Sequence, residues 1–307
     1  TAERPVPSST SSSKPAPVDL LPVLTPGGAR HLFAVLALAA LLFAAWSLLL
    51  WLGRPRTGAA QNQLVANQIA AERVLRDAPP VLLLGSSMTA LVPEQPFGRA
   101  GNLGFNAASA TTGLELVRRA GLRPAAVVVE TNLLDLPADE GLVALADPWS
   151  RRRQAVPALR VEHQPVNLAL SLLRGDGPRR RTTADPGRRE RGVQAKLEEF
   201  AQAETRPARD RRDAAERAAA AIATAGDAVD ALLVAGIRVV LVELPIDARL
   251  AAAPRFAGVR AAVRARFPAE RYRWVELPQR DWQTRDGIHL VTDDAEAVAM
   301  ALAAALR

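Results

Sequence analysis

Three groups of polar residues have the types and the spacing that acyl-transfer chemistry needs. Ser87 lies in the stretch VLLLGSSMT, residues 81–89, where four apolar residues are followed by a glycine and two serines. Asp286 and His289 stand three residues apart near the end of the sequence, and Asn132 follows a second apolar run. Because the chain has only three histidines, a histidine-dependent site has few possible members.

A serine hydroxyl becomes an effective nucleophile when a neutral histidine accepts its proton and a carboxylate orients the imidazole. We therefore assign Ser87, His289 and Asp286 to these three roles. An asparagine amide can stabilise the oxyanion of such a reaction, and Asn132 is our candidate for it. Two serines after a strand are also common in turns and helix caps, and His289 could be a plain polar residue beside a helix, so these alternatives stay open.

The elements predicted around these residues alternate between strands and helices. Strands are predicted at residues 81–84, 102–105, 125–130, 237–244 and 272–277. Three of them contain continuous apolar runs, at residues 81–84, 125–129 and 239–242, as in strands buried on both faces. Helices are predicted at residues 111–120, 213–235, 259–267 and 293–306. The order indicates a doubly wound parallel sheet, an α/β/α sandwich of the flavodoxin-like type. In such sheets the carboxyl ends of the strands share one edge, where Ser87, Asn132 and Asp286 with His289 would meet.

The beginning of the sequence has a different organisation. Residues 1–30 form a Pro- and Ser-rich stretch that we expect to be a disordered tail. An uncharged run begins at Leu32 and ends at Leu52, which predicts a transmembrane helix at residues 31–53. A cleaved signal peptide and a buried helix are the alternatives. Residues 54–80 are predicted to be a stem or linker, with a helix at residues 59–77, where Leu64, Ala71 and Leu75 recur at helical spacing. Residues 81–307 are predicted to be the domain, which we expect on the outer side of the membrane.

The basic excess of the chain is concentrated in its middle. Between Arg151 and Arg217 there are sixteen Arg and one Lys against ten acidic residues, an excess of +7 that equals the net charge of the whole chain. We interpret residues 135–212 as a helical, Arg-rich insertion. Because no aromatic residues alternate with the arginines, we do not expect nucleic acid as a partner. A solvated helical face, or contact with anionic lipid or polymer, remains open.

The residues at the sheet edge resemble those of the SGNH or GDSL hydrolases. Their first block is Gly-Asp-Ser, here Gly85-Ser86-Ser87, and their last block is Asp-x-x-His, here Asp286-Gly287-Ile288-His289. The oxyanion asparagine of their third block corresponds to Asn132. The resemblance covers roughly residues 81–307, apart from the insertion.

The sequence departs from that pattern at several positions. Ser86 replaces the usual aspartate, and Glu130 stands where glycine is common. In the second block an alanine occupies the position of the oxyanion glycine, so the backbone N–H near Ala107 would serve together with that of Ser87. Leu133 stands where an aspartate is common. These departures leave the three assigned residues intact and affect the oxyanion hole.

The resemblance, with the membrane anchor, implies a serine esterase or O-acyltransferase for acetyl or acyl groups of an envelope polysaccharide or exopolysaccharide. It implies no cofactor and no metal. It also implies an inner (plasma) membrane protein with its domain in the periplasm, beside a multi-spanning acyltransferase or a polysaccharide synthase complex. The alternative is an SGNH-fold subunit without catalysis that binds polymer or partners.

Other motifs give weaker indications. There is no Gly-x-Ser-x-Gly elbow, no GxGxxG after the first strand and no phosphate-loop lysine. Nothing near His163 in the sequence suggests a site. Asp135, Asp139 and Glu140 could form a metal cluster, but a solvated loop explains them as well.

Overall fold

The computed structural model describes residues 26–53, 62–174 and 185–307. The chain divides into two compact units, Thr1–Leu52 and Gly53–Arg307, which we describe separately. Most of the predicted tail, residues 1–25, and most of the predicted linker, residues 54–61, lie outside the described residues.

The first unit contains one apolar helix, α1 (Pro26–Gly53). Within its residues Gly28–Gly53, an 18-residue stretch has a mean hydropathy of 2.5. At 1.5 Å per residue the helix is longer than the roughly 30 Å of a bilayer core. The hydroxyl of Ser47 donates to the carbonyl of Phe43 at 2.8 Å, so this polar side chain is satisfied within the helix itself. By length and composition α1 could span a membrane once, and a signal sequence would have the same properties.

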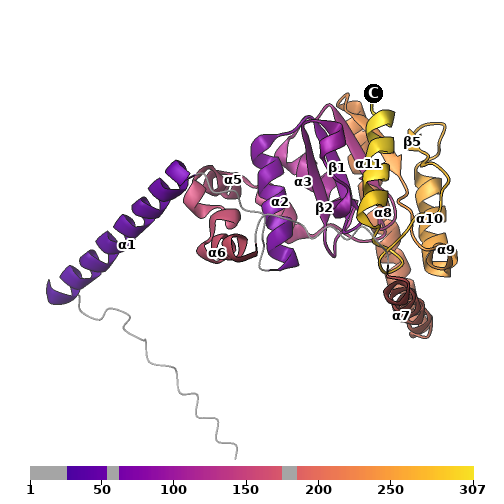
Figure 1. Ribbon diagram of the computed structural model, residues 1–307, viewed down its shortest axis with the longest axis horizontal. Helices are drawn as coiled ribbons and strands as arrows, with labels where there is room; N and C mark the ends of the chain where they lie inside the picture. Colours follow the sequence, from indigo (N-terminus) through magenta and orange to yellow (C-terminus); the bar gives the residue numbers. More distant parts are fainter. Residues whose placement is uncertain (1–25, 54–61, 175–184) are drawn as a thin grey trace, which may run out of the picture. The chain divides into compact units, whose positions relative to one another are not determined.

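The second unit is built on a five-stranded sheet (Figure 1). The strands are β1 (Val81–Ser86), β2 (Ala100–Phe105), β3 (Ala126–Glu130), β4 (Arg238–Val242) and β5 (Trp274–Val275). Their order is β2-β1-β3-β4-β5 and every pair is parallel, which confirms the predicted fold class. The last strand lies at one edge of the sheet and has only two residues, and Pro278, soon after it, has no N–H for further pairing.

Ten helices accompany this sheet in the described part of the second unit. They are α2 (Gln63–Asp77), α3 (Ala110–Ala120), α4 (Glu140–Val143), α5 (Pro148–Ala155), α6 (Pro165–Arg174), α7 (Pro186–Glu204), α8 (Ala208–Val234), α9 (Ala248–Ala252), α10 (Pro254–Arg266) and α11 (Thr292–Ala305). The predicted helices correspond to α2, α3, α8, α10 and α11. Gly121 ends α3 at φ 64, a left-handed conformation that glycine adopts without steric penalty.

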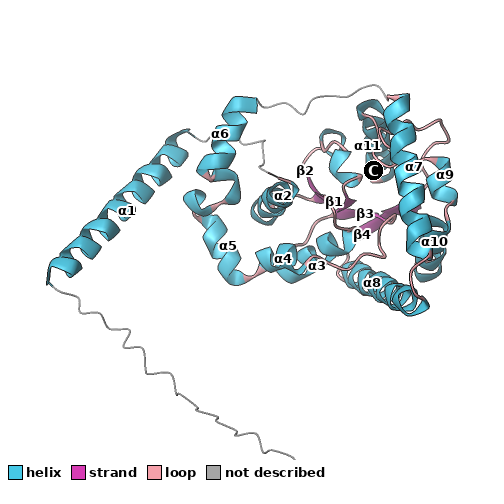
Figure 2. Ribbon diagram, turned by 90° about the horizontal axis from the view of Figure 1, so that it is seen from below, coloured by secondary structure: helices cyan, strands magenta, loops and turns pink. Residues whose placement is uncertain are grey.

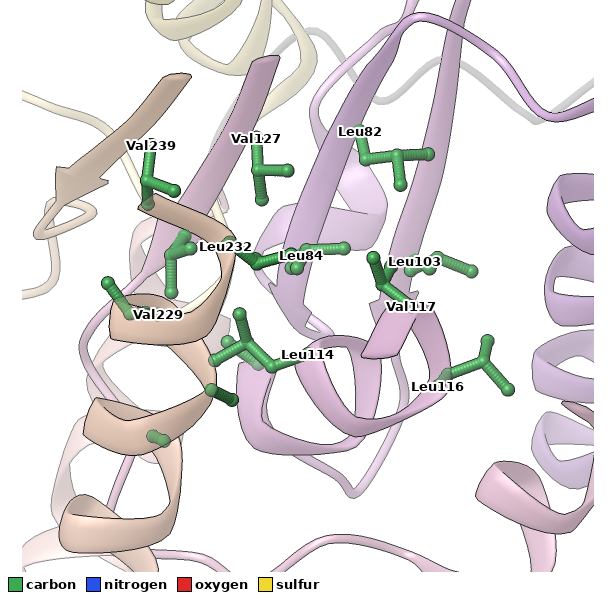
Figure 3. Packing of buried hydrophobic residues seen from close by; sticks show 14 of the residues in the cluster. Leu82, Leu84, Leu103, Leu114, Leu116, Val117, Val127, Val229, Leu232 and Val239 are labelled. Carbon is green, nitrogen blue, oxygen red and sulfur yellow. The ribbon is translucent and has the colours of Figure 1, made fainter. Parts of the chain in front are cut away.

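Helices cover both faces of the sheet (Figure 2). Alternate side chains of the strands, such as Leu82, Leu84 and Val127, pack against α2, α3 and α8 (Figure 3). The intervening side chains, such as Leu83 and Val128, pack against α11 on the other face. Complete burial of one Leu or Val side chain stabilises the fold by about 1.5–3 kcal/mol. The continuous apolar runs of the sequence are therefore explained by burial on both faces.

Two segments have features that the sequence does not indicate. Helix α2, within the residues predicted to be a stem, contributes Ala71, Val74 and Leu75 to the same apolar core as the sheet. The insertion at residues 135–212 contains the short helices α4, α5 and α6, but also the 19-residue helix α7. Interspersed Arg and Gly residues hide the apolar period of α7, which buries only Val193 completely.

Candidate active site

The chain order brings three functional side chains together at the carboxyl edge of the sheet. Ser87 directly follows β1, and the loop that contains Asp286 and His289 precedes α11. The hydroxyl oxygen of Ser87 lies 2.8 Å from Nε2 of His289, although the two residues are 202 positions apart. The other ring nitrogen, Nδ1 of His289, lies 2.7 Å from Oδ2 of Asp286. These two contacts form a continuous Ser-His-Asp chain of hydrogen bonds.

The Asp286 carboxylate is held by the backbone of its own loop. Its Oδ1 accepts hydrogen bonds from the N–H groups of Ile288 at 3.1 Å and His289 at 2.9 Å. Burial alone would raise the pKa of Asp286, but the hydrogen bonds from the His289 ring and from these backbone groups lower this pKa to about 2. Asp286 is therefore ionised near neutral pH, and its Oδ2 accepts a hydrogen bond from the N–H at Nδ1 of His289.

The hydrogen bond to Asp286 determines the tautomer of His289. With the imidazole proton on Nδ1, Nε2 of His289 has a free lone pair and accepts from the hydroxyl of Ser87. This is the tautomer that a general base for a serine requires. The side chains of His289 and Asp286 are 32% and 35% exposed, so the chain of hydrogen bonds is accessible from solvent.

Asn132 lies just after β3, but its side chain is paired with another part of the backbone. Its amide nitrogen donates to the carbonyl of Leu244 at 2.8 Å, and its oxygen accepts from the N–H of Leu244 at 2.7 Å. The residue is 5% exposed. This reciprocal pair connects the ends of β3 and β4, and it leaves one amide proton of Asn132 for any other partner. The predicted oxyanion role of Asn132 stays a prediction.

Ala107 occupies a conformation that favours glycine. Its φ is 60°, in the left-handed region, and its side chain is exposed. The neighbouring Asn106 is fixed by Asn67 of α2: Asn106 N–H donates to Asn67 Oδ1, and Asn67 Nδ2 donates to the Asn106 carbonyl, both at 2.9 Å. A glycine at position 107 would adopt this loop conformation without strain, which agrees with the alignment of Ala107 to a glycine.

Helix α7 of the insertion packs directly on the loop of Asp286. A Cβ atom on Gly192 would lie 2.5 Å from the carbonyl oxygen of Asp286 and 2.8 Å from its Cα. The next residue, Val193, is fully buried, and its side chain lies over Gly287, which has a φ of 92°. In addition, Arg189 pairs with Asp247 at 3.1 Å, and the N–H of Asp247 donates to the Gly287 carbonyl at 2.7 Å. The basic insertion therefore contributes to the shape of the candidate site.

Sequence reasoning did not find this contact, or a second one beneath Ser87. Gly192 is an isolated glycine within a helix, a pattern that sometimes marks close packing, but it does not tell which segment approaches. In the sequence, Glu130 is notable only because it stands where glycine is common in the SGNH pattern. In the structure its carboxylate is buried at the end of β3 and hydrogen-bonds Ser86 and Thr89 on either side of Ser87.

The remaining polar candidates do not join these residues. His163 is bonded through Nδ1 to the carbonyl of Pro157, in the insertion. Asp135 pairs with Arg255 at 2.7 Å, and Asp139 caps α4 by accepting from the N–H of Leu142. In the described part of the chain, no group of three or more His, Asp or Glu side chains is arranged to hold a metal ion.

Comparisons with known proteins do not assign a family to the chain. No protein-family model matches it, and neither curated proteins nor solved structures give a match. What the chain shares with the SGNH hydrolases is therefore its architecture: a five-stranded parallel sheet in the order 2-1-3-4-5 is consistent with a fold of that type.

Proposed function

We propose that this protein is a membrane-anchored serine esterase or O-acyltransferase of the SGNH type. The single observation that carries the proposal is the continuous hydrogen-bonded chain from Ser87 Oγ through the His289 ring to Asp286. It lies at the carboxyl edge of a parallel sheet, where α/β proteins bind their ligands. A carboxylate with a low pKa keeps the imidazole in the tautomer that can accept a proton from serine.

The reaction follows from this geometry. Ser87 Oγ attacks the carbonyl carbon of an ester while its proton passes to Nε2 of His289, and the carbonyl electrons move to the oxygen. Asp286 stabilises the imidazolium that forms. When the carbonyl re-forms, the leaving alkoxide takes the proton from Nε2, and the acyl group stays on Ser87. His289 then removes a proton from the acceptor hydroxyl, and the acceptor oxygen attacks the acyl carbon. The bond between this carbon and Ser87 Oγ breaks, and Oγ takes the proton back from Nε2.

The acceptor in the second step distinguishes an esterase from a transferase. Water gives a free acid, whereas a sugar hydroxyl gives a new ester. The partial exposure of His289 and Asp286 suits an ester that projects from a large polymer. Together with the apolar helix α1, this favours an extracytoplasmic polysaccharide as the substrate. A transferase would need a supplier of acyl groups, for which a multi-spanning acyltransferase or a synthase complex is our proposed partner.

The proposed location can be tested because the chain contains no cysteine. Val234, at the end of α8, is 90% exposed, so Val234→Cys would introduce a single accessible thiol into the full chain. We expect a membrane-impermeant maleimide to label this thiol from the extracytoplasmic side in intact cells. Labelling that appears only after lysis would place the domain in the cytosol.

The activity is tested on the full chain in detergent micelles. We expect the protein to hydrolyse an activated acetyl ester and to be labelled by a serine-directed phosphonate, and Ser87→Ala to abolish both. O-acetylated polysaccharides, offered with and without a second polysaccharide as acceptor, then separate hydrolysis from transfer. Absence of turnover and labelling in the wild type would contradict the proposal.

A second function is favoured by one specific observation. The Asn132 amide is engaged with Leu244, and alanine replaces glycine at position 107, so the predicted oxyanion hole differs from the family pattern. A subunit that binds polymer or partners without catalysis would tolerate these differences. It would bind an acylated polysaccharide with equal affinity in wild type and Ser87→Ala, and the phosphonate would label neither.

A further inference from the structure

Glu130 is a buried carboxylate that the proposed reaction does not use. It is the last residue of β3, and it is 2% exposed. None of the ion pairs between described residues includes it. Burial raises the pKa of Glu130, and hydrogen bonds from Thr89 and Ser86 oppose this rise. A carboxylate in such a place is unfavourable unless its oxygens are fully hydrogen-bonded, so its partners indicate its role.

Among the described residues, the Glu130 carboxylate hydrogen-bonds only Ser86 and Thr89. These two residues flank the candidate nucleophile Ser87 and its neighbour Met88. Oε1 accepts from the hydroxyl of Ser86 at 2.7 Å. Oε2 accepts from the N–H of Ser86 at 2.9 Å, and from the hydroxyl and the N–H of Thr89 at 2.5 Å and 3.2 Å. Ser87 lies between these two anchored residues, and the carboxylate therefore holds both ends of the turn that carries it.

Gly85 lies close to the Glu130 carboxylate, and no side chain would fit between them. A Cβ atom on Gly85 would lie 2.4 Å from Oε2 of Glu130 and 2.0 Å from the hydroxyl oxygen of Thr89. The Ser86 hydroxyl, while donating to Glu130, also accepts from the N–H of Met88 at 3.2 Å. Ser86 and Thr89 thus hydrogen-bond Glu130 directly, and Met88 hydrogen-bonds Ser86. Gly85 lies close to the carboxylate, with no room for a side chain.

Two of the departures from the SGNH pattern meet at this point. Ser86 stands where the first block has an acid, Glu130 stands where the third block has glycine, and the two side chains bond to each other. We propose that Glu130 is a positioning residue that fixes the Ser87 turn within reach of His289. The chain thereby keeps one carboxyl group at this junction but supplies it from β3 instead of β1. This inference rests on the proposed function, because it concerns the orientation of Ser87 for catalysis.

The test compares Glu130→Gln with wild type in the full chain. In this variant an NH2 group replaces one carboxylate oxygen. This group cannot accept the hydrogen bonds that Ser86 and Thr89 donate, so the turn must shift. Displacement of a reacting atom by about 1 Å can reduce a rate by 10²-fold, so we expect phosphonate labelling of Ser87 to slow by about 10- to 100-fold. The KM for an activated acetyl ester should change little. Glu216→Gln, at an exposed carboxylate paired with Arg212, is the control and should label at the wild-type rate.

A rescue variant separates positioning from general loss of stability. Ser86→Asp combined with Glu130→Gly restores the arrangement of the family, and it should label faster than Glu130→Gly alone. If Glu130→Gln does not fold, Thr89→Val removes a single hydroxyl donor and should slow labelling in the same direction, by a smaller factor. The unfolding midpoint of each variant shows whether the rate and the stability change together.

Amide hydrogen exchange keeps this inference separable from the proposed function. In wild type we expect slow exchange at the N–H groups of Ser86 and Thr89, and in Glu130→Gln faster exchange at both. If the wild type is not labelled at all, the proposed function fails, and the exchange rates still decide whether Glu130 holds the turn. Wild-type labelling rates in Glu130→Gln, or unchanged exchange at these two amides, would overturn the inference.

Discussion

Replacement of Gly192 by alanine tests whether α7 positions the Asp286 loop. The added Cβ would lie 2.5 Å from the Asp286 carbonyl oxygen, whereas ordinary contacts lie at 3.4–4 Å. Because the neighbouring atoms belong to the backbone, no side-chain rotation relieves the contact, and helix and loop must separate by about 1 Å. Such overpacking costs about 1–3 kcal/mol, and the better helix propensity of alanine offsets about 1 kcal/mol of it.

The effect on activity should be larger than the effect on stability. A shift of about 1 Å at Asp286 moves the His289 ring away from Ser87, for which we expect a loss of about 10²-fold in kcat for an activated acetyl ester. Gly258→Ala is the matched control: Gly258 also lies within a helix, α10, but no atom approaches its Cβ position within 4 Å. That variant should gain up to about 1 kcal/mol in stability and keep its activity.

The assays are urea unfolding and ester hydrolysis, each measured on the two variants and the wild type. If Gly192→Ala gains stability and keeps full activity like Gly258→Ala, then α7 does not position the loop. The basic insertion would in that case have only a solvated or a binding role.

Three further changes have expected outcomes. Ala107→Gly should raise the free energy of unfolding by about 1 kcal/mol, because φ 60° is strained for alanine, and a loss of stability in urea unfolding would contradict this. The fold lowers the pKa of Asp286 from 3.8 to about 2. The interactions of the Asp286 carboxylate therefore stabilise the fold fully above about pH 4, and this stabilisation is lost as the pH falls through 2. Asp286→Asn should flatten the dependence of the unfolding free energy on pH between about pH 4 and pH 2. Asn132→Ala leaves Leu244 unpaired and should cost about 1–3 kcal/mol in stability; a kcat lowered by about 10²-fold would support its oxyanion role, and an unchanged kcat would exclude it.

The sequence predicted the architecture well because the strands bury both faces. Residues 81–84 and 125–129 are apolar without interruption, and they lie in β1 and β3 at the centre of the sheet. The apolar helix predicted at residues 31–53 is likewise present, as part of α1. At one edge of the sheet the prediction is less accurate: β5 is two residues long where six were predicted, and Arg273 and Glu276 interrupt the apolar pattern there.

The meeting of Ser87, Asn132 and the Asp286 loop at one edge followed from topology, since parallel strands all end on the same side. The contacts between them could not be predicted from spacing. Asn132 turns to Leu244, whose position depends on the register between β3 and β4. Gly192 and Asp286 are 94 positions apart in the sequence, and only the packed fold brings the two together.

The central claim is that Ser87 forms a covalent acyl intermediate with the help of His289. Its most direct test is mass spectrometry of the full chain, quenched in acid during turnover of an activated acetyl ester and then digested. We predict one acetyl group on the peptide that contains Ser87, absent in Ser87→Ala and much reduced in His289→Ala. Turnover without any acetyl group on that peptide, or equal acetylation in the His289→Ala variant, would contradict the claim.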